Sequence, residues 1–208
     1  MSNKKNIAIV ILSGGLGSRL DGKGKYSKSL LGKKLIEHTY DRVKNQTKIV
    51  AINLKKRVNN PLQSSNIECT YDFYKENIGP LAGIHAALKF SKKKFPKNDN
   101  LICTVPVDTP FLPYDLLDKL YLSYLKSDAS ITIACSNRRR HPTIALWNTN
   151  ILTSLENSIE KGIRKIDIFT KEFKIGYANW EYIEIDPFFN INNLRDLKKA
   201  ENILQNRA

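Results

Sequence analysis

Short apolar runs alternate with helical stretches along most of the chain, and this alternation constrains the fold more than any other feature. Strands that alternate with helices form βαβ units, in which most strands run parallel. We therefore expect an α/β fold with a single doubly wound, mostly parallel sheet flanked by helices. The expected strands cover about 7–13, 48–54, 67–71, 101–105, 130–135, 143–148 and 182–186, and the expected helical stretches cover about 33–45, 80–93, 114–126, 150–161, 164–171 and 193–205.

The 208 residues suit one domain over 1–208, because no internal repeat or low-complexity linker divides the chain. A hydrophobic content of 41% favours a folded chain over a disordered one. No apolar stretch reaches the roughly 18 residues that span a bilayer. The apolar run 7–13 is followed at once by Gly14 and lacks a cleavage site, so it is interpreted as a buried strand and not as a signal peptide. We expect a cytoplasmic protein with no membrane partner.

The formal net charge of +14 favours anionic partners, such as nucleic acid or phosphorylated small molecules. Zinc-finger spacing, an RNP-type aromatic motif and a basic recognition helix are all missing from the sequence, which disfavours specific nucleic-acid binding. Arg138, Arg139 and Arg140 form a basic cluster in an expected loop between two strands and are a candidate anion clamp. Cys69, Cys103 and Cys135 are far apart, so neither zinc nor a disulfide framework is predicted.

A Gly-rich loop follows the first expected strand directly, and it starts Leu12-Ser13-Gly14-Gly15. Glycines allow backbone N–H groups to turn toward a triphosphate. Three cations, Arg19, Lys25 and Lys28, can neutralise phosphate charge. The P-loop and dinucleotide-binding patterns are both missing, and a purely structural turn is the alternative interpretation.

Two further motifs fall at the same edge of the expected sheet. Asp108 follows the strand 101–105 and is placed to hold Mg²⁺ against phosphate oxygens, although Asp-Thr-Pro also starts turns. Gly79-Pro80 opens a helix whose N-terminus can receive an anion or a base edge, although it also suits an ordinary helix start. In such sheets the ligand lies beyond the carboxyl ends of the strands. The loops after residues 13, 53, 71 and 105 should therefore meet at one crevice.

Together these motifs resemble the molybdenum cofactor guanylyltransferase family from about residue 7 to residue 200. The motifs that carry the resemblance are Leu-x-Gly-Gly-x-x-x-Arg-x-x-Gly-x-x-Lys, Gly-Pro-Leu-Ala-Gly, Asp-Thr-Pro, His-Pro-Thr-Ile-Ala-Leu and a late Asn-x-Asn. The last two are the most specific. The resemblance implies a Rossmann-like nucleotidyltransferase fold, GTP and molybdopterin as substrates, and Mg²⁺ as cofactor. It also leaves room for protein partners in cofactor biosynthesis or chaperones of the acceptor enzymes.

The resemblance implies a role for each matching residue. Arg19, Lys25 and Asp108 would be catalytic, and Asp108 would also bind the metal. The implied nucleotide-binding residues are Leu12, Ser13, Gly14, Gly15, Lys25, Asn53, Asp72, Gly79, Pro80, Leu81 and Asp108. The implied pterin-binding residues are Arg138, His141, Pro142, Thr143, Asn190 and Asn192.

Some positions depart from the family pattern. Gly24 stands where the family usually has Asp before its loop lysine, and Lys28 would be the phosphate ligand if the loop carries an insertion. We prefer Lys25, because the alignment without gaps reaches residues 32–33. Asn193 replaces a Thr at the start of the last helix and caps it equally well. His38 and His85 lie on expected helices and are interpreted as surface or packing residues.

The implied reaction is transfer of GMP from GTP to molybdopterin. Its phosphate is already an anion, so positioning and electrostatic stabilisation suffice and no strong general base is required. Alternatives are a cytidylyltransferase acting on the same pterin or on an isoprenoid phosphate, and a nucleotide-binding protein without catalytic activity, which Gly24 makes conceivable. The Gly14-Gly15 pair favours guanine over cytosine.

Overall fold

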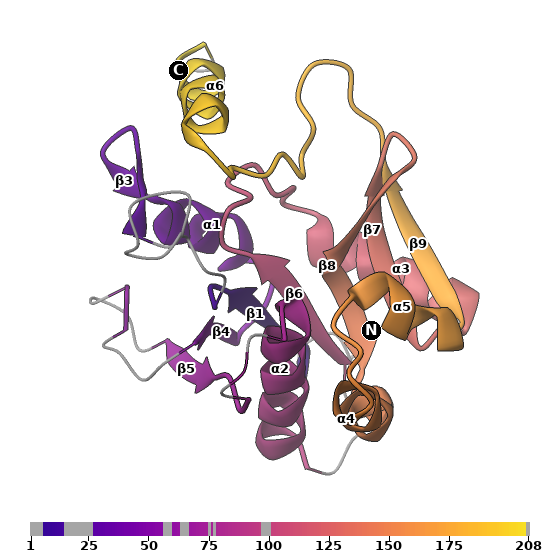
Figure 1. Cartoon of the computed structure of the whole chain (residues 1–208). Coiled ribbons are helices and arrows are strands. Elements are labelled where there is room, and N and C mark those ends of the chain that lie inside the picture. The colour runs from indigo at the N-terminus through magenta and orange to yellow at the C-terminus, as the bar shows by residue number, and fades with distance from the viewer. Residues whose placement is uncertain are drawn as a thin grey trace.

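The computed structural model describes residues 6–14, 27–55, 60–62, 67–74, 76, 78–96 and 101–206. A seven-stranded sheet forms its centre (Figure 1). The strands of this sheet are β1 (Ala8–Leu12), β4 (Val50–Leu54), β5 (Glu68–Tyr71), β6 (Leu101–Pro106), β7 (Ile131–Ser136), β8 (Arg139–Asn148) and β9 (Ile175–Trp180). A small hairpin joins β2 (Ser29–Leu30) to β3 (Lys33–Lys34).

The order of the central sheet is β5-β4-β1-β6-β8-β7-β9. Its first four strands are parallel, and β7 and β9 are parallel to each other. Only β8 among the described strands of this sheet runs antiparallel, to both β6 and β7. The expectation of a mostly parallel α/β sheet flanked by helices is thereby confirmed.

Helices cover both faces of the sheet (Figure 1). They are α1 (Leu35–Val43), α2 (Pro80–Lys94), α3 (Leu116–Ser127), α4 (Leu152–Glu160), α5 (Ile166–Phe169) and α6 (Leu194–Gln205), with the 3₁₀ turns η3 (Thr149–Ile151) and η4 (Thr170–Glu172). Buried side chains of α1 and α3 pack on one face. Those of α2, α4 and α5 pack on the other, and α6 packs beside the β2–β3 hairpin. No helix in the described segments is long and apolar enough to cross a membrane.

Local chemistry explains where two of these helices start. Gly79 has a φ of +65°, which glycine adopts at little cost, and Pro80 occupies the first helical position of α2. The side chain of Asn193 accepts a 2.9 Å hydrogen bond from the backbone N–H of Asp196. The predicted Asn cap of the last helix is therefore confirmed.

Two sequence predictions were wrong. The expected strand at 182–186 is absent there, and the last strand of the sheet is β9 at Ile175–Trp180 instead. Alternate residues Gly176, Ala178 and Trp180 are buried against α3, whereas Ile183 is fully exposed. The physical reason is close packing: a Cβ on Gly176 would lie 2.4 Å from Ser127 Oγ, so small residues suit this strand.

The basic cluster was also misplaced, because Arg139 and Arg140 belong to β8 and not to a loop. Only Asn137 and Arg138 form the turn, with φ values of +41° and +72°. Positive φ at both central residues is typical of a two-residue hairpin turn. The tight turn therefore extends β8 to Arg139, four residues before its expected start.

Candidate active site

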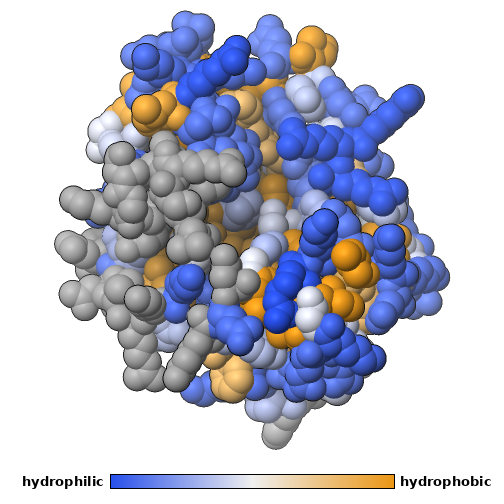
Figure 2. All heavy atoms as spheres, viewed as in Figure 1, coloured by the Kyte–Doolittle hydropathy of each residue, from blue (hydrophilic) through white to orange (hydrophobic). Residues whose placement is uncertain are grey.

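A central pocket of about 250 Å³ opens at the carboxyl ends of the parallel strands. The loops after β1, β4, β5 and β6 all contribute to it, which confirms the predicted crevice. The surface is hollowed above the start of α2, and hydrophobic residues show at the floor of this hollow (Figure 2). The lining residues are Leu12, Gly14, Asn53, Lys55, Asp72, Glu76, Ile78, Gly79, Pro80, Ala82, Gly83, Pro106, Val107, Asp108 and Thr143.

Asn53 and Asp72 form a hydrogen-bonded pair on one wall of the central pocket. Asn53 donates from Nδ2 to Oδ1 of Asp72 at 3.0 Å. Ser13 donates from Oγ to the backbone carbonyl of Asn53 at 2.9 Å, which links the first loop to this pair. Burial raises the pKa of Asp72, while the hydrogen bond from Asn53 and the charge of Lys55 oppose that shift. Asp72 is thus a partly desolvated hydrogen-bond acceptor on one wall of the pocket.

Two glycines allow the chain to approach this pair closely. A Cβ on Gly83 would lie 2.8 Å from Asn53 Oδ1, which is closer than real contacts allow. A Cβ on Gly14 would lie 3.1 Å from Asp72 Oδ2. Asn53 Oδ1 is buried and has no hydrogen-bond partner within the described residues. An unsatisfied buried acceptor costs free energy, so this atom is a candidate contact for a donor on a ligand.

Asp108 lies across the pocket, just beyond the end of β6, and is only 5% exposed. Asn190 donates from Nδ2 to Asp108 Oδ1 at 2.8 Å, and the backbone N–H of Ile191 donates to the Asp108 carbonyl at 2.9 Å. Asn190 Oδ1 is buried without a partner among the described groups. Two contacts from the C-terminal part of the chain therefore hold Asp108 in place.

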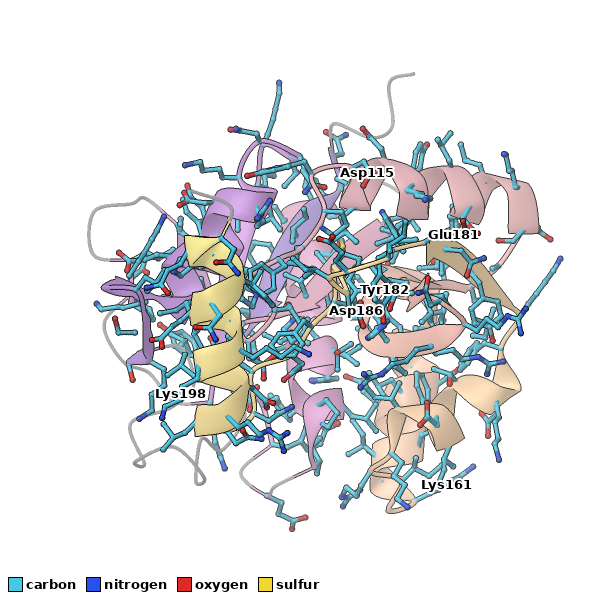
Figure 3. All side chains as sticks on the ribbon, turned by 90° about the horizontal axis from the view of Figure 1, so that it is seen from above. Asp115, Lys161, Glu181, Tyr182, Asp186 and Lys198 are labelled. Carbon is cyan, nitrogen blue, oxygen red and sulfur yellow. The ribbon has the colours of Figure 1, made fainter. Side chains whose placement is uncertain are left out.

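These contacts come from the C-terminal connector, residues 181–193, which joins β9 to α6. Seen from above, the connector crosses the molecule past Glu181, Tyr182 and Asp186 to reach α6 (Figure 3). Phe188 anchors it, since its ring packs against Trp180 and His141 with centroids 5.1 and 4.8 Å apart. The connector thereby places Asn190 beside Asp108.

The donors around Asp108 suit Mg²⁺. The described residues contain no group of three or more His, Cys, Asp or Glu side chains that could hold a metal by themselves. Mg²⁺ often binds through one or two carboxylates together with substrate phosphates and water. The buried carboxylate of Asp108 and the unpartnered amide oxygen of Asn190 fit this pattern, which makes them the candidate metal side of the pocket.

His141 lies inside the fold and not at a free surface. It is 8% exposed, and its Nε2 is hydrogen-bonded to Ser136 Oγ at 2.7 Å. Burial lowers its pKa, so the ring is neutral near pH 7. In this position His141 supports Phe188 and hence the C-terminal connector.

The other predicted pterin residues are spread over a wider area. Thr143 lines the central pocket, as Asp108 does. Arg138 lies at the tip of the β7–β8 hairpin and lines the hairpin cleft, an open cleft of about 1040 Å³ formed by residues 137–138 and 179–185. Pro142 is half-buried on β8. Asn192 is exposed, and its backbone N–H donates to Asp196 at the start of α6.

Among the predicted nucleotide residues, Leu81 is fully buried in the core and does not line the pocket. Gly15, Arg19 and Lys25 lie outside the described residues. Lys28 lies just before β2, and its backbone carbonyl accepts a hydrogen bond from Leu35. The choice between Lys25 and Lys28 therefore stays a prediction.

Sequence reasoning missed several residues of the central pocket. Gly83 was noticed only as part of the Gly-Pro-Leu-Ala-Gly motif, yet it provides the closest approach to Asn53. Lys55 follows Asn53 by two positions, and this spacing from a strand end was a usable signal. Ala82 belongs to the same motif as Gly83, and Pro106 and Val107 directly precede Asp108. Glu76 and Ile78 carried no such signal.

The sheet order, the glycine-bordered pocket and the buried aspartate at its edge define a nucleotidyltransferase. Residues 9–172 match the family model described as the MobA-like NTP transferase domain. A molybdenum cofactor guanylyltransferase of Rhodopseudomonas palustris is 33% identical over 197 residues, covering 93% of this chain and 90% of that protein. Another, of Rhizobium meliloti, is 34% identical over 200 residues, covering 92% and 89%. The chain belongs to the molybdenum cofactor guanylyltransferase family.

A solved structure agrees with this assignment. The molybdopterin-guanine dinucleotide biosynthesis protein A of Archaeoglobus fulgidus has a TM-score of 0.74 and 27% sequence identity to this chain. The superposition covers 96% of this chain and 100% of that protein. The similarity therefore extends over nearly the whole chain.

Proposed function

We propose that this protein transfers GMP from GTP to the phosphate of molybdopterin or the molybdenum cofactor. The products are pyrophosphate and the guanine dinucleotide form of the cofactor. The observation that carries the proposal is the placement of two aspartates, Asp72 and Asp108, in one pocket. The first suits a base with hydrogen-bond donors, and the second suits a metal-bound phosphate.

Asp72 supports guanine as the base. The Watson–Crick edge of guanine offers two adjacent donors, N1–H and the N2 amino group, and a carboxylate can accept both. Cytosine offers one donor beside two acceptors there, and the acceptors would face the Asp72 carboxylate unfavourably. Asn53 holds Asp72 Oδ1 from the side. Gly14 and Gly83 have no Cβ, so the backbone lies close against this pair where it lines the pocket.

The phosphate side would be formed by Asp108 and the loop cations. Bound at Asp108, Mg²⁺ would neutralise charge on the triphosphate and stabilise the charge that gathers as pyrophosphate leaves. Lys25 and Arg19 would hold the triphosphate from the Gly-rich loop. Asn190 keeps the Asp108 carboxylate in one orientation.

The transfer itself needs no strong base. An oxygen of the molybdopterin phosphate attacks the α-phosphorus of GTP and forms a new P–O bond. The bond between the α-phosphorus and its bridging oxygen to the β-phosphate breaks, and the electron pair leaves on pyrophosphate. The protein's part is to hold two polyanions in line, and the cations of the site reduce their repulsion.

The acceptor would approach from the side of β8 and the C-terminal connector. Thr143, Asn190 and Asn192 would line that side, with Arg138 further out and Pro142 between them. His141 would act through its contact with Phe188, which holds the connector in place.

A thermal-shift panel tests the choice of nucleotide, and a turnover assay tests the reaction. With Mg²⁺ present, GTP should raise the melting temperature more than CTP or ATP. Pyrophosphate should appear only when GTP and molybdopterin are both supplied. Larger stabilisation by CTP would indicate the cytidylyltransferase alternative. Binding of GTP without pyrophosphate release would indicate a nucleotide-binding protein without catalytic activity.

Asp108→Asn tests the metal side of the proposal. Asn at this position keeps an oxygen that can accept from Asn190, so the fold should survive. The charge is lost, and turnover should fall by about 100-fold or more, as expected when a charge-assisted contact is removed. Near-normal pyrophosphate release by the folded variant would contradict the role of Asp108.

A further inference from the structure

His85 is a fully buried polar side chain that does not line the central pocket. It lies on the second turn of α2, and its Nε2 is 3.0 Å from Oε1 of Glu156 on α4. Its Nδ1 is buried with no hydrogen-bond partner in the described part of the chain. Burying an imidazole in this way costs free energy compared with an aliphatic side chain, so its presence calls for a reason beyond filling the core.

The loop that follows Asp72 packs directly on the His85 ring. The rings of Phe73 and Tyr74 lie 5.9 and 5.0 Å from the His85 ring, centroid to centroid, and 5.5 Å from each other. Lys89, one turn further along α2, places its Nζ 5.2 Å from the Phe73 ring. Phe73 is 71% exposed, so burial alone does not hold it there.

The contacts connect the pocket wall to the helix pair behind it. Asp72 immediately precedes Phe73 and Tyr74, so the position of these two rings limits where the Asp72 carboxylate can lie. Glu156 limits the rotation of the His85 ring through the Nε2 contact. The orientation of Asp72 therefore depends on α4 through His85, in addition to its direct bond with Asn53.

We propose that His85, held by Glu156, is a positioning residue for base recognition: its ring is the surface on which Phe73 and Tyr74 hold Asp72 toward the guanine. This inference rests on the proposed use of GTP. It assigns to His85 an effect on discrimination between purines, which a residue that only stabilises the core would not have.

The groups around His85 favour a single protonation state of the His85–Glu156 pair near neutral pH. Burial lowers the pKa of His85, and the hydrogen bond with His85 lowers the pKa of Glu156. The neutral ring therefore donates from Nε2 to an ionised carboxylate. Lys89 lies 3.6 Å from the same carboxylate oxygen, and the charge of Asp72 opposes the lowering of the His85 pKa only weakly. The pair is consequently a fixed support and not a pH switch in this range.

The experiment compares GTP with inosine triphosphate, which lacks the N2 amino group, in calorimetric titrations of the whole chain. Asp72→Asn measures the discrimination that the carboxylate provides. His85→Leu should weaken GTP binding by about tenfold and inosine triphosphate binding much less, so that the ratio of the two dissociation constants falls toward that of Asp72→Asn. Phe73→Leu removes the same ring contact at an exposed position and should lower the ratio in the same direction, even if His85→Leu fails to fold.

Leu120→Ala is the matched control, because Leu120 is buried on α3 against the opposite face of the sheet. It should lower the melting temperature and leave the ratio unchanged. Suppose that Asp72→Asn lowers the ratio of the two dissociation constants. The inference is then overturned if His85→Leu and Phe73→Leu leave this ratio unchanged, including the case in which both variants weaken the binding of GTP and of inosine triphosphate equally. If Asp72→Asn also leaves the ratio unchanged, the proposed guanine contact itself is wrong.

Discussion

Asn190 donates a 2.8 Å hydrogen bond from Nδ2 to Oδ1 of Asp108, although 82 positions separate the two residues. The adjacent N–H of Ile191 donates to the Asp108 carbonyl, and the Ile191 side chain is buried in the cluster that includes Leu30 and Leu35. The C-terminal connector therefore completes the side of the pocket that we propose for Mg²⁺. Packing at the far end of the chain determines how the Asp108 carboxylate is oriented.

Asn190→Ala should weaken the apparent affinity of the enzyme for Mg²⁺ while the melting temperature changes little. A hydrogen bond to a charged group contributes roughly 1.5–3 kcal/mol, which corresponds to about tenfold to hundredfold in apparent affinity. The Mg²⁺ concentration that gives half-maximal turnover should rise accordingly. The measurement is a Mg²⁺ titration of pyrophosphate release.

The neighbouring Asn192 provides the control for that titration. Its backbone N–H donates to the Asp196 carboxylate, a hydrogen bond that Asn192→Ala retains. Asn192→Ala should therefore keep the Mg²⁺ dependence within about twofold, while the proposed pterin contact predicts a higher KM for molybdopterin. Equal shifts in Mg²⁺ dependence for both variants would argue against a specific role of Asn190.

GTP affinity should fall as the pH falls. The fall should begin at a higher pH than it would for a carboxyl group with an ordinary pKa. Asp72 must be ionised to accept both donors of guanine, and burial raises its pKa above the usual value of 3.8. The affinity for GTP is therefore highest above the raised pKa of Asp72, and it is lost as the pH falls through that pKa. Dissociation constants measured across the acid range should show this step, and Asp72→Asn should remove it.

Without nucleotide, Asp72→Asn should stabilise the protein at neutral pH. A carboxyl group whose pKa is raised on folding binds protons more tightly in the folded state, so its ionisation lowers the free energy of unfolding as the pH rises through that pKa. Asn avoids this cost and can still accept from Asn53. If the variant melts at a lower temperature than the wild type at neutral pH, the buried charge of Asp72 does not destabilise the fold.

Gly83→Ala should damage GTP binding through Asn53. The added Cβ would lie 2.8 Å from Asn53 Oδ1, so the amide must move and its bond to Asp72 must change. Overpacking of this kind costs about 1–3 kcal/mol. Gly162→Ala is the control, since its φ of +83° strains any substitution, but among the described residues no atom beyond its chain neighbours lies within 4 Å of the new Cβ. Both variants should melt earlier, and only Gly83→Ala should lose GTP affinity in a calorimetric titration.

The two loop lysines can be separated by kinetics. If Lys25 is the triphosphate ligand, Lys25→Ala should lower kcat/KM by about tenfold to hundredfold. Lys28→Ala should then change it only a few-fold, and salt should remove even that difference. The opposite ranking would assign the phosphate contact to Lys28 and show that the loop carries an insertion. Small and equal effects would favour a protein that binds nucleotide without turnover.

The strands that bear the site were predictable because they are buried on both faces and end in recognisable residues. β1, β4 and β6 are apolar runs, and each ends near a glycine, an asparagine or an aspartate that lines the central pocket. Parallel strands bring their carboxyl ends to one edge. The positions of Gly14, Asn53, Asp72 and Asp108 in one pocket followed from that rule.

The C-terminal part was harder to predict for a physical reason. Residues 182–186 have strand-like alternation, but they pair with no strand in the described part of the chain, and Ile183 is exposed. In β9, Gly176, Ala178 and Asn179 interrupt the residues that favour a strand, and its pairing with β7 and packing on α3 stabilise it. Long-range partners of this kind are not visible in a local pattern.

By itself, the sequence determined the alternation of strands and helices, the parallel character of the sheet and the residues at its carboxyl edge. These depend on local chemistry: apolar periodicity, glycine turns and helix caps act over a few residues. Only the tertiary structure decided that His141 faces inward, that Leu81 belongs to the core, and that Asn190 contacts Asp108. Those outcomes depend on which side chains meet after the chain has folded back on itself, because hydrogen bonds and ring contacts extend over only a few ångströms, however far apart their residues lie in the sequence.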